Sequence, residues 1–78
     1  MTVTVVLLGH LSRYAQNGTP GQWQGDIDEG TRLKDLARQV GIPDGASEMA
    51  TINGTLKSFD TLVPSDAQVL FFSPMSGG

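Results

Sequence analysis

"DEGTRLKDLARQVGIP", residues 28–43, decides the fold class, because it predicts a clear amphipathic helix. Its apolar residues recur at the spacing of one helix face: Leu33, Leu36, Ala37 and Val40. Thr31 is expected to cap the start, Gly41 to end the helix, and Pro43 to prevent its continuation. The chain therefore contains one helix of about ten residues, which needs a partner for its apolar face.

Strands are predicted on both sides of that helix. Val3 to Leu8 is an apolar, β-branched run typical of a central strand, and "QWQGDI", residues 22–27, alternates as a half-buried strand does and is expected to pair with it as a hairpin. Asn53-Gly54 predicts a tight hairpin, and Gln68 to Phe72 the last strand. One helix against a mixed sheet of four or five strands makes an α+β roll.

The second face of this sheet is the open question. A single helix covers only one face of a sheet. Residues 5–8 and residues 69–72 are each four consecutive apolar residues, and successive side chains of a strand point to opposite faces. Two residues of each run are therefore expected on the face that the helix does not cover. Either the segment Gly9–Gly21, with a short helical turn that buries Leu11 and Tyr14, folds over that face, or an apolar patch is left for a partner. For Phe72, a partner is the favoured explanation.

Composition narrows the function classes. The 78 residues predict one small domain, with a net charge of −3 and no cysteine. Without cysteine there is no disulfide, thiolate nucleophile, iron–sulfur cluster or thiolate zinc site, which suits a cytoplasmic protein. The negative charge opposes nucleic-acid binding, and the N-terminal apolar run is too short for a membrane span.

Side-chain chemistry offers no convincing active site. His10 and Ser12 lack the third group and the oxyanion hole of a serine hydrolase. The acidic residues near position 28 suit the positive end of a helix better than a metal site: Asp26, Asp28 and Glu29. The helix cations are expected to keep the helix soluble: Arg32, Lys34 and Arg38. We expect no bound metal or cofactor, and no enzyme activity of the chain alone.

The last residues, "SPMSGG" at 73–78, suggest a different chemistry. Two glycines without Cβ atoms would pass through a narrow channel, and six extended residues would reach about 20 Å. Pro74 cannot prolong strand pairing there. A frayed end is the plain alternative. The sharper hypothesis is that the carboxylate of Gly78 reacts inside a partner enzyme.

These features resemble the ubiquitin-like β-grasp sulfur carriers, most closely the small subunit of molybdopterin synthase, with the thiamine-pathway carrier as a relative. The resemblance runs through "GTRLKDLARQV" at the helix, "ATINGTLKSFDTLV" at the hairpin and "VLFFSPMSGG" at the finish. Ser73 stands where many molybdopterin-type members have a proline, and "GHLSRYAQNGTPGQW" is only loosely similar. The resemblance implies a β-grasp domain at residues 1–72 and a flexible tail at 73–78.

The resemblance also implies a function for that tail. An adenylating enzyme of the ubiquitin-activating type consumes ATP to adenylate Gly78, a persulfide protein supplies sulfur for a thiocarboxylate, and the large molybdopterin synthase subunit or another acceptor enzyme receives it. The implied partner-binding residues are Gly77, Ser76, Met75, Pro74 and Phe72. Three alternatives stay open: a carrier for thiamine or another metabolite, a protein modifier joined to lysines through Gly78, and an interaction module with an idle tail.

Overall fold

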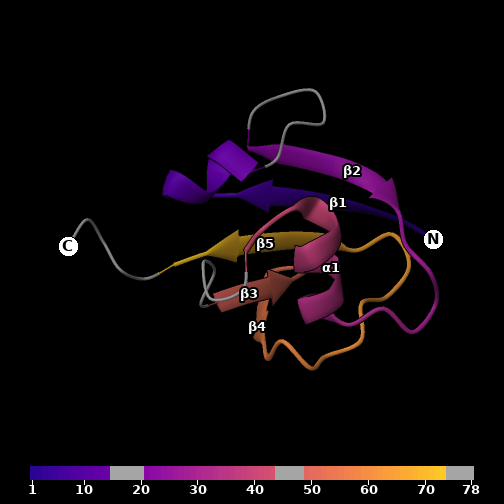
Figure 1. Cartoon of the computed structure of the whole chain (residues 1–78). Coiled ribbons are helices and arrows are strands. Elements are labelled where there is room, and N and C mark those ends of the chain that lie inside the picture. Colours follow the sequence, from indigo (N-terminus) through magenta and orange to yellow (C-terminus); the bar gives the residue numbers. More distant parts are fainter. Residues whose placement is uncertain (15–20, 44–48, 74–78) are drawn as a thin grey trace.

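Five strands and one α-helix form the part of the chain that the computed structural model describes, residues 1–14, 21–43 and 49–73 (Figure 1). The elements in chain order are β1 (Thr2–Leu7), the 3-10 helix η1 (Gly9–Tyr14), β2 (Gln22–Asp26), α1 (Leu33–Val40), β3 (Met49–Ile52), β4 (Thr55–Lys57) and β5 (Gln68–Phe72). The predicted α+β class is confirmed. Among these residues, no helix is long and apolar enough to cross a membrane.

The sheet has the order β2-β1-β5-β3-β4, so the first and last strands lie side by side at its centre (Figure 1). β1 and β5 run parallel, with Val5 opposite Val69 and Leu7 opposite Phe71. The other three pairings are antiparallel, including the predicted hairpin of β1 and β2. The consecutive apolar residues of β1 and β5 therefore supply apolar side chains to both faces at the centre of the sheet.

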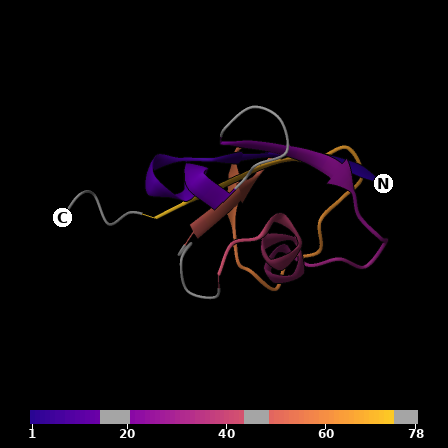
Figure 2. The same ribbon diagram turned by 45° about the horizontal axis from the view of Figure 1, so that its top comes forward.

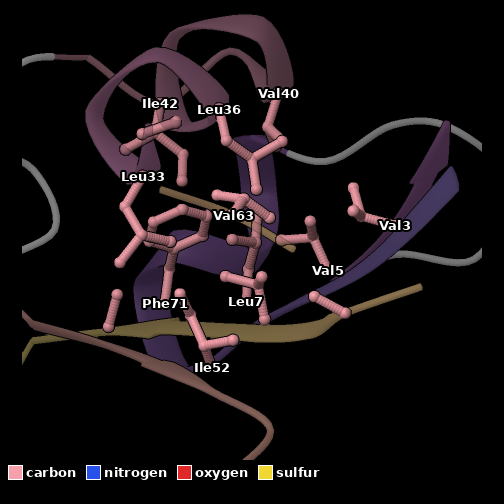
Figure 3. Close-up of a cluster of buried hydrophobic side chains, with 14 of the residues drawn as sticks. Val3, Val5, Leu7, Leu33, Leu36, Val40, Ile42, Ile52, Val63 and Phe71 are labelled. Atoms are coloured by element: carbon pink, nitrogen blue, oxygen red, sulfur yellow. The ribbon is translucent and has the colours of Figure 1, made fainter. Parts of the chain in front are cut away.

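Helix α1 lies on one side of the sheet (Figure 2). Its apolar face packs on alternate residues of the central strands, and Figure 3 shows Leu33, Leu36 and Val40 directed toward the sheet. The sheet contributes the facing side of this core: Val3, Val5, Leu7, Ala50, Ile52, Val69 and Phe71. Burying each large side chain contributes about 1.5–3 kcal/mol, so this core is the main source of stability.

The start of α1 differs from the prediction. Arg32, not Thr31, is the N-cap, and its backbone N–H donates to the Asp35 carboxylate at 3.3 Å. Thr31 uses its hydroxyl to donate to the Asp28 carbonyl, and its own carbonyl accepts from Val63 N–H. This long-range contact holds Thr31 before the helix. The predicted end is confirmed, because Gly41 has the left-handed conformation with φ 108°.

Segment η1 lies on the helix side of the sheet. Leu11 is fully buried in the same core as the α1 residues, and Tyr14 packs against that core, as predicted. The described residues 9–14 therefore do not cover the second face. Residues 15–20 lie outside the described residues.

The predicted Asn53-Gly54 hairpin connects β3 and β4. Both turn residues have positive φ, 50° and 87°, as a two-residue turn of this type requires. Asn53 also binds β5: its side-chain oxygen accepts from Gln68 N–H at 2.9 Å, and its own N–H donates to the Gln68 carbonyl at 2.8 Å. The turn is thereby fixed against the central strand.

Candidate functional site

The tail end of β5 is where sequence reasoning placed the site. β5 ends at Phe72. The other candidate residues, Pro74, Met75, Ser76, Gly77 and Gly78, lie outside the described residues, so their proposed roles stay predictions. Of the predicted site residues, Phe72 alone is described.

Phe72 is half-buried, with its side chain on the sheet face away from α1. It lies opposite Met49 in the pairing of β5 with β3. Leu8 follows β1 at the same end of the sheet, where its N–H donates to the Phe71 carbonyl at 3.1 Å, and it is 47% exposed. Large apolar side chains thus surround the point where the chain leaves the sheet.

The face away from α1, called the open face below, continues this apolar surface toward the middle of the sheet. Val6, Leu70 and Thr51 lie side by side across β1, β5 and β3, and Leu56 of β4 is opposite Thr51. Leu56 is 55% exposed, and the others are half-buried. This arrangement confirms that alternate residues of the apolar runs emerge on the second face.

A hollow of about 190 Å³ lies in the open face beside Leu70. It is lined by residues of the three inner strands and of the hairpin turn: Val6, Thr51, Gly54, Gln68, Val69 and Leu70. Sequence reasoning missed this hollow together with Met49 and Thr51. The Asn-Gly turn alone predicts that Thr51 lies opposite Leu56, but the pairing of β3 with β5 was not apparent from the sequence.

The ionised side chains of the described strands avoid this region. Alternation places Asp26 on the open face, but at its far end, where its carboxylate accepts from the Thr2 hydroxyl at 2.8 Å. The polar residues that flank the apolar part are uncharged: Thr4, Gln22, Gln24 and Gln68. The open face is therefore apolar near the end of β5 and polar beyond it, with the carboxylate of Asp26 at its far end.

Two charged side chains at the start of α1 contact Asp60 on the helix side of the sheet. Lys34 Nζ is 3.2 Å from a carboxylate oxygen of Asp60, and the Arg32 guanidinium donates to the Asp60 carbonyl at 2.6 Å. Both contacts join the start of the helix to the loop that precedes β5. The helix cations Arg32 and Lys34 thus connect elements of this chain, beyond the predicted role in solubility.

The acidic residues before α1 are not arranged as a metal site. Asp28, Glu29 and Asp26 are exposed, and among the described residues no three His, Cys, Asp or Glu side chains come together as metal ligands would. Asp28 acts through its backbone carbonyl, which accepts from both the N–H and the hydroxyl of Thr31. The cluster therefore belongs to the turn before the helix.

Comparison with solved structures establishes the ubiquitin-like β-grasp fold. The chain is similar to the crystal structure of SAMP1 from Haloferax volcanii, with a TM-score of 0.74 and 15% identity over 100% of each chain. A crystal structure of small archaeal modifier protein 1 from H. volcanii matches with a TM-score of 0.73 and 12% identity, over 95% of this chain and 98% of that one. No protein-family model and no curated protein matches this chain by sequence.

Proposed function

We propose that this chain is a sulfur carrier whose Gly78 carboxylate is adenylated, converted to a thiocarboxylate and used as a sulfur source in cofactor biosynthesis. The observation that carries the proposal is the position of β5. It is a central strand of a β-grasp sheet, and it ends at Phe72 on an apolar face. Gly77 and Gly78 follow five and six residues after Phe72. A partner seated on that face would have the two glycines within reach of its own active site.

The proposed chemistry activates an otherwise unreactive carboxylate. A carboxylate oxygen of Gly78 attacks the α-phosphorus of ATP on the activating enzyme, which forms an acyl-adenylate and releases pyrophosphate. A persulfide sulfur of the donor protein then attacks the acyl carbon and displaces AMP. A partner thiol reduces the resulting acyl disulfide at its S–S bond and leaves the thiocarboxylate on Gly78. The chain itself serves as the substrate of these enzymes, and ATP is bound by the activating enzyme.

Molybdopterin is the proposed destination of the sulfur, with the large molybdopterin synthase subunit as acceptor. The support is the resemblance of the helix, hairpin and tail segments to the small subunit of that synthase. Deleting the gene and supplying either molybdopterin-dependent products or thiamine tests the assignment. Rescue by thiamine alone would assign the chain to the thiamine pathway instead.

Protein modification is a second candidate function, favoured by the structural similarity to small archaeal modifier protein 1. In that case a lysine amine of a target protein attacks the same acyl-adenylate and displaces AMP. Both functions share the activated carboxylate and differ in the nucleophile. Both also place the chain beside ATP-consuming enzymes in the cytoplasm, which fractionation of native cells would test.

Intact mass spectrometry of the protein from its native cells separates these functions. A chain ending at Gly78, with one carboxylate oxygen replaced by sulfur, supports the carrier. Remnants of the tail in isopeptide linkage to lysines of other proteins support the modifier. A chain whose mature end is not Gly78, or on which purified activating enzyme and ATP never form an acyl-adenylate, contradicts both.

Deletion of Gly78 is the matched variant for this assay. We expect it to abolish acyl-adenylate formation and to leave the circular dichroism spectrum unchanged, because β5 ends at Phe72, before the deleted residue. Ser73→Ala is the control, since it alters a tail residue outside the implied partner-binding set and keeps both glycines. An unfolded deletion variant would show that the tail is structural.

A further inference from the structure

We infer that Asn53 is a site of spontaneous deamidation that the folded chain protects and the unfolded chain exposes. The reacting pair is Asn53 and Gly54, the two residues of the turn between β3 and β4. The protecting contacts are the two hydrogen bonds that join Asn53 to Gln68 of β5, called the Asn53 clamp below. This modification is independent of the proposed chemistry at Gly78.

The reaction is intramolecular and needs no enzyme. The backbone nitrogen of Gly54 gives up its proton to a base in the solvent and attacks the side-chain carbonyl carbon, Cγ, of Asn53. The bond between Cγ and Nδ2 breaks, and Nδ2 takes a proton from water and leaves as ammonia. The product is a succinimide ring. Glycine after asparagine favours this step, because Gly54 has no side chain to obstruct its own nitrogen.

Water then opens the succinimide at either of its two carbonyl carbons. Attack at Cγ breaks the bond to the Gly54 nitrogen and gives aspartate. Attack at the main-chain carbonyl carbon gives isoaspartate, in which the backbone runs through Cβ and Cγ and is one atom longer. No oxidant or reductant takes part. Each product carries a carboxylate in place of the amide and therefore adds one negative charge to the chain.

Burial does not protect this pair. Asn53 and Gly54 are both exposed, so water and a solvent base reach them in the folded chain. Nothing lies within 4 Å of the position that a Cβ of Gly54 would occupy. Protection must therefore come from the backbone conformation of the turn and from the contacts that hold the Asn53 side chain.

The backbone conformation keeps the two reacting atoms apart. Asn53 has φ 50° and Gly54 has φ 87°, and a turn with positive φ at both residues also has a positive ψ at the first. With such a ψ, the Gly54 nitrogen lies nearly opposite Cβ across the Cα–C bond of Asn53. The succinimide needs the nitrogen and Cβ on the same side of that bond. Ring closure therefore requires the turn to open first.

The Asn53 clamp opposes that opening. The side-chain oxygen Oδ1 accepts from Gln68 N–H at 2.9 Å, and the Asn53 N–H donates to the Gln68 carbonyl at 2.8 Å. Both the backbone and the side chain of the reacting residue are thus bound to a central strand of the sheet. Local opening of a turn held in this way costs free energy, which lowers the fraction of chains able to react.

The two products would act differently on the fold. Aspartate keeps an oxygen that can accept from Gln68 N–H, and it tolerates a positive φ as asparagine does. Isoaspartate inserts a backbone atom into the turn and thereby disturbs the pairing of β3 with β4. A chain that reacts while unfolded should refold with nearly full stability as aspartate and with lower stability as isoaspartate. Urea denaturation of the separated products measures this difference.

Peptide mapping of the full chain after incubation at mildly alkaline pH tests the inference. The chain is kept folded or is unfolded in urea, and the peptide of residues 51–56 is the reference in both solutions. Mass spectrometry follows conversion at Asn53 separately from Asn17-Gly18, an Asn-Gly pair outside the described residues. We expect the unfolded chain to react at the rate of the peptide, and the folded chain about tenfold more slowly or more. Equal rates in the two states, or faster conversion in the folded chain, overturns the inference.

Gln68→Pro tests the role of the clamp, because proline lacks the N–H that binds Oδ1 of Asn53. Gln68 is the first residue of β5, a position at which strands accept proline. The variant should keep its circular dichroism spectrum and convert Asn53 about threefold faster or more, as loss of one hydrogen bond implies. Gln68→Ala is the matched control, since it keeps the backbone N–H and should react at the original rate. A folded proline variant that reacts no faster than the control would remove the clamp from the explanation.

Amide hydrogen exchange supplies a second measurement should Gln68→Pro not fold. The Gln68 N–H should exchange slowly in the unchanged chain and in Asn53→Asp, because both keep a side-chain oxygen as its acceptor. It should exchange faster in Asn53→Ala, which lacks that acceptor. Equal exchange of the Gln68 N–H in the unchanged chain and in Asn53→Ala would show that the clamp does not hold the turn and would overturn the inference.

Discussion

Phe71 and Phe72 are neighbours on β5 but belong to opposite faces of the sheet. Phe71 is fully buried under α1, and its ring centroid lies 6.0 Å from that of Phe59. Phe72 is half-buried on the open face, beside Met49. One strand therefore serves two purposes: its helix-side residues hold the fold together, and its open-face residues form a surface that the chain itself leaves uncovered.

The largest expected effect is a loss of stability on the helix side. Phe71→Ala should lower the free energy of unfolding by about 3–5 kcal/mol, because it removes a fully buried ring and leaves a cavity. Phe72→Ala should lower the free energy of unfolding by about 1 kcal/mol or less, because the ring of Phe72 is only half-buried in the folded chain. Urea denaturation measures both values.

Phe71→Leu accompanies this pair in case Phe71→Ala does not fold. It keeps an apolar side chain and should fold with an intermediate stability. Equal losses for Phe71→Ala and Phe72→Ala would break the distinction between the two faces.

The next effect concerns binding and should reverse the order of the two phenylalanines. Phe72→Ala should weaken binding to the activating enzyme or the large synthase subunit by about 1–3 kcal/mol, as loss of an interface anchor does. Phe71→Leu should leave binding nearly unchanged, because the ring of Phe71 has no exposed surface. Isothermal titration calorimetry compares them. Undiminished binding by Phe72→Ala to both proteins would remove Phe72 from the interface.

Two glycines sharpen the comparison further. Gly25→Ala would bring a Cβ within 2.7 Å of the Trp23 ring on the helix side, whereas Gly54→Ala meets no atom within 4 Å but must keep a φ of 87°. Each substitution should lower the free energy of unfolding by about 1–2 kcal/mol. Gly25→Ala should do so through overpacking against Trp23, and Gly54→Ala through backbone strain. Trp23 is the single tryptophan, so its fluorescence should change for Gly25→Ala only. A changed emission in Gly54→Ala would contradict this separation.

The smallest effect is expected from the charges beside the helix. Lys34 and Asp60 form an ion pair whose side chains are 50% and 78% exposed. Lys34→Met should therefore change the free energy of unfolding by about 0.5 kcal/mol or less, because solvent screens such pairs. Urea denaturation at low and high salt measures it. A loss above 1 kcal/mol would show that the contacts at Asp60 support the core.

Local patterns predicted most of the elements correctly. The helical spacing around Leu36 identified α1, and Asn53-Gly54 identified the hairpin, because each signal is contained in a few neighbouring residues. Consecutive apolar residues in β5 also predicted that side chains would emerge on both faces. Thr31 was wrongly predicted as the N-cap, because the contact with Val63 that holds it before the helix joins residues distant in sequence.

The candidate site was less predictable than the fold. Phe72 was identified from its place before the tail, but the hollow depends on how β3, β5 and β1 are aligned with one another. No motif in the sequence encodes that alignment. The sequence likewise did not indicate on which face of the sheet the segment after β1 lies. The structure places Leu11 of this segment in the helix-side core. Whether residues 73–78 form a flexible tail stays a prediction.

The central pairing of β1 with β5 has a consequence for synthesis on the ribosome. Because β5 is bonded to both β1 and β3, it joins two halves of the sheet that otherwise share no strand contact. The nascent chain cannot complete this join until residues 68–72 have left the exit tunnel, and pairings between distant segments are slow to form. A prematurely terminated product lacking β5 would lack both the strand that joins the two halves of the sheet and the terminal glycines, so it should neither fold nor carry the proposed reactive group.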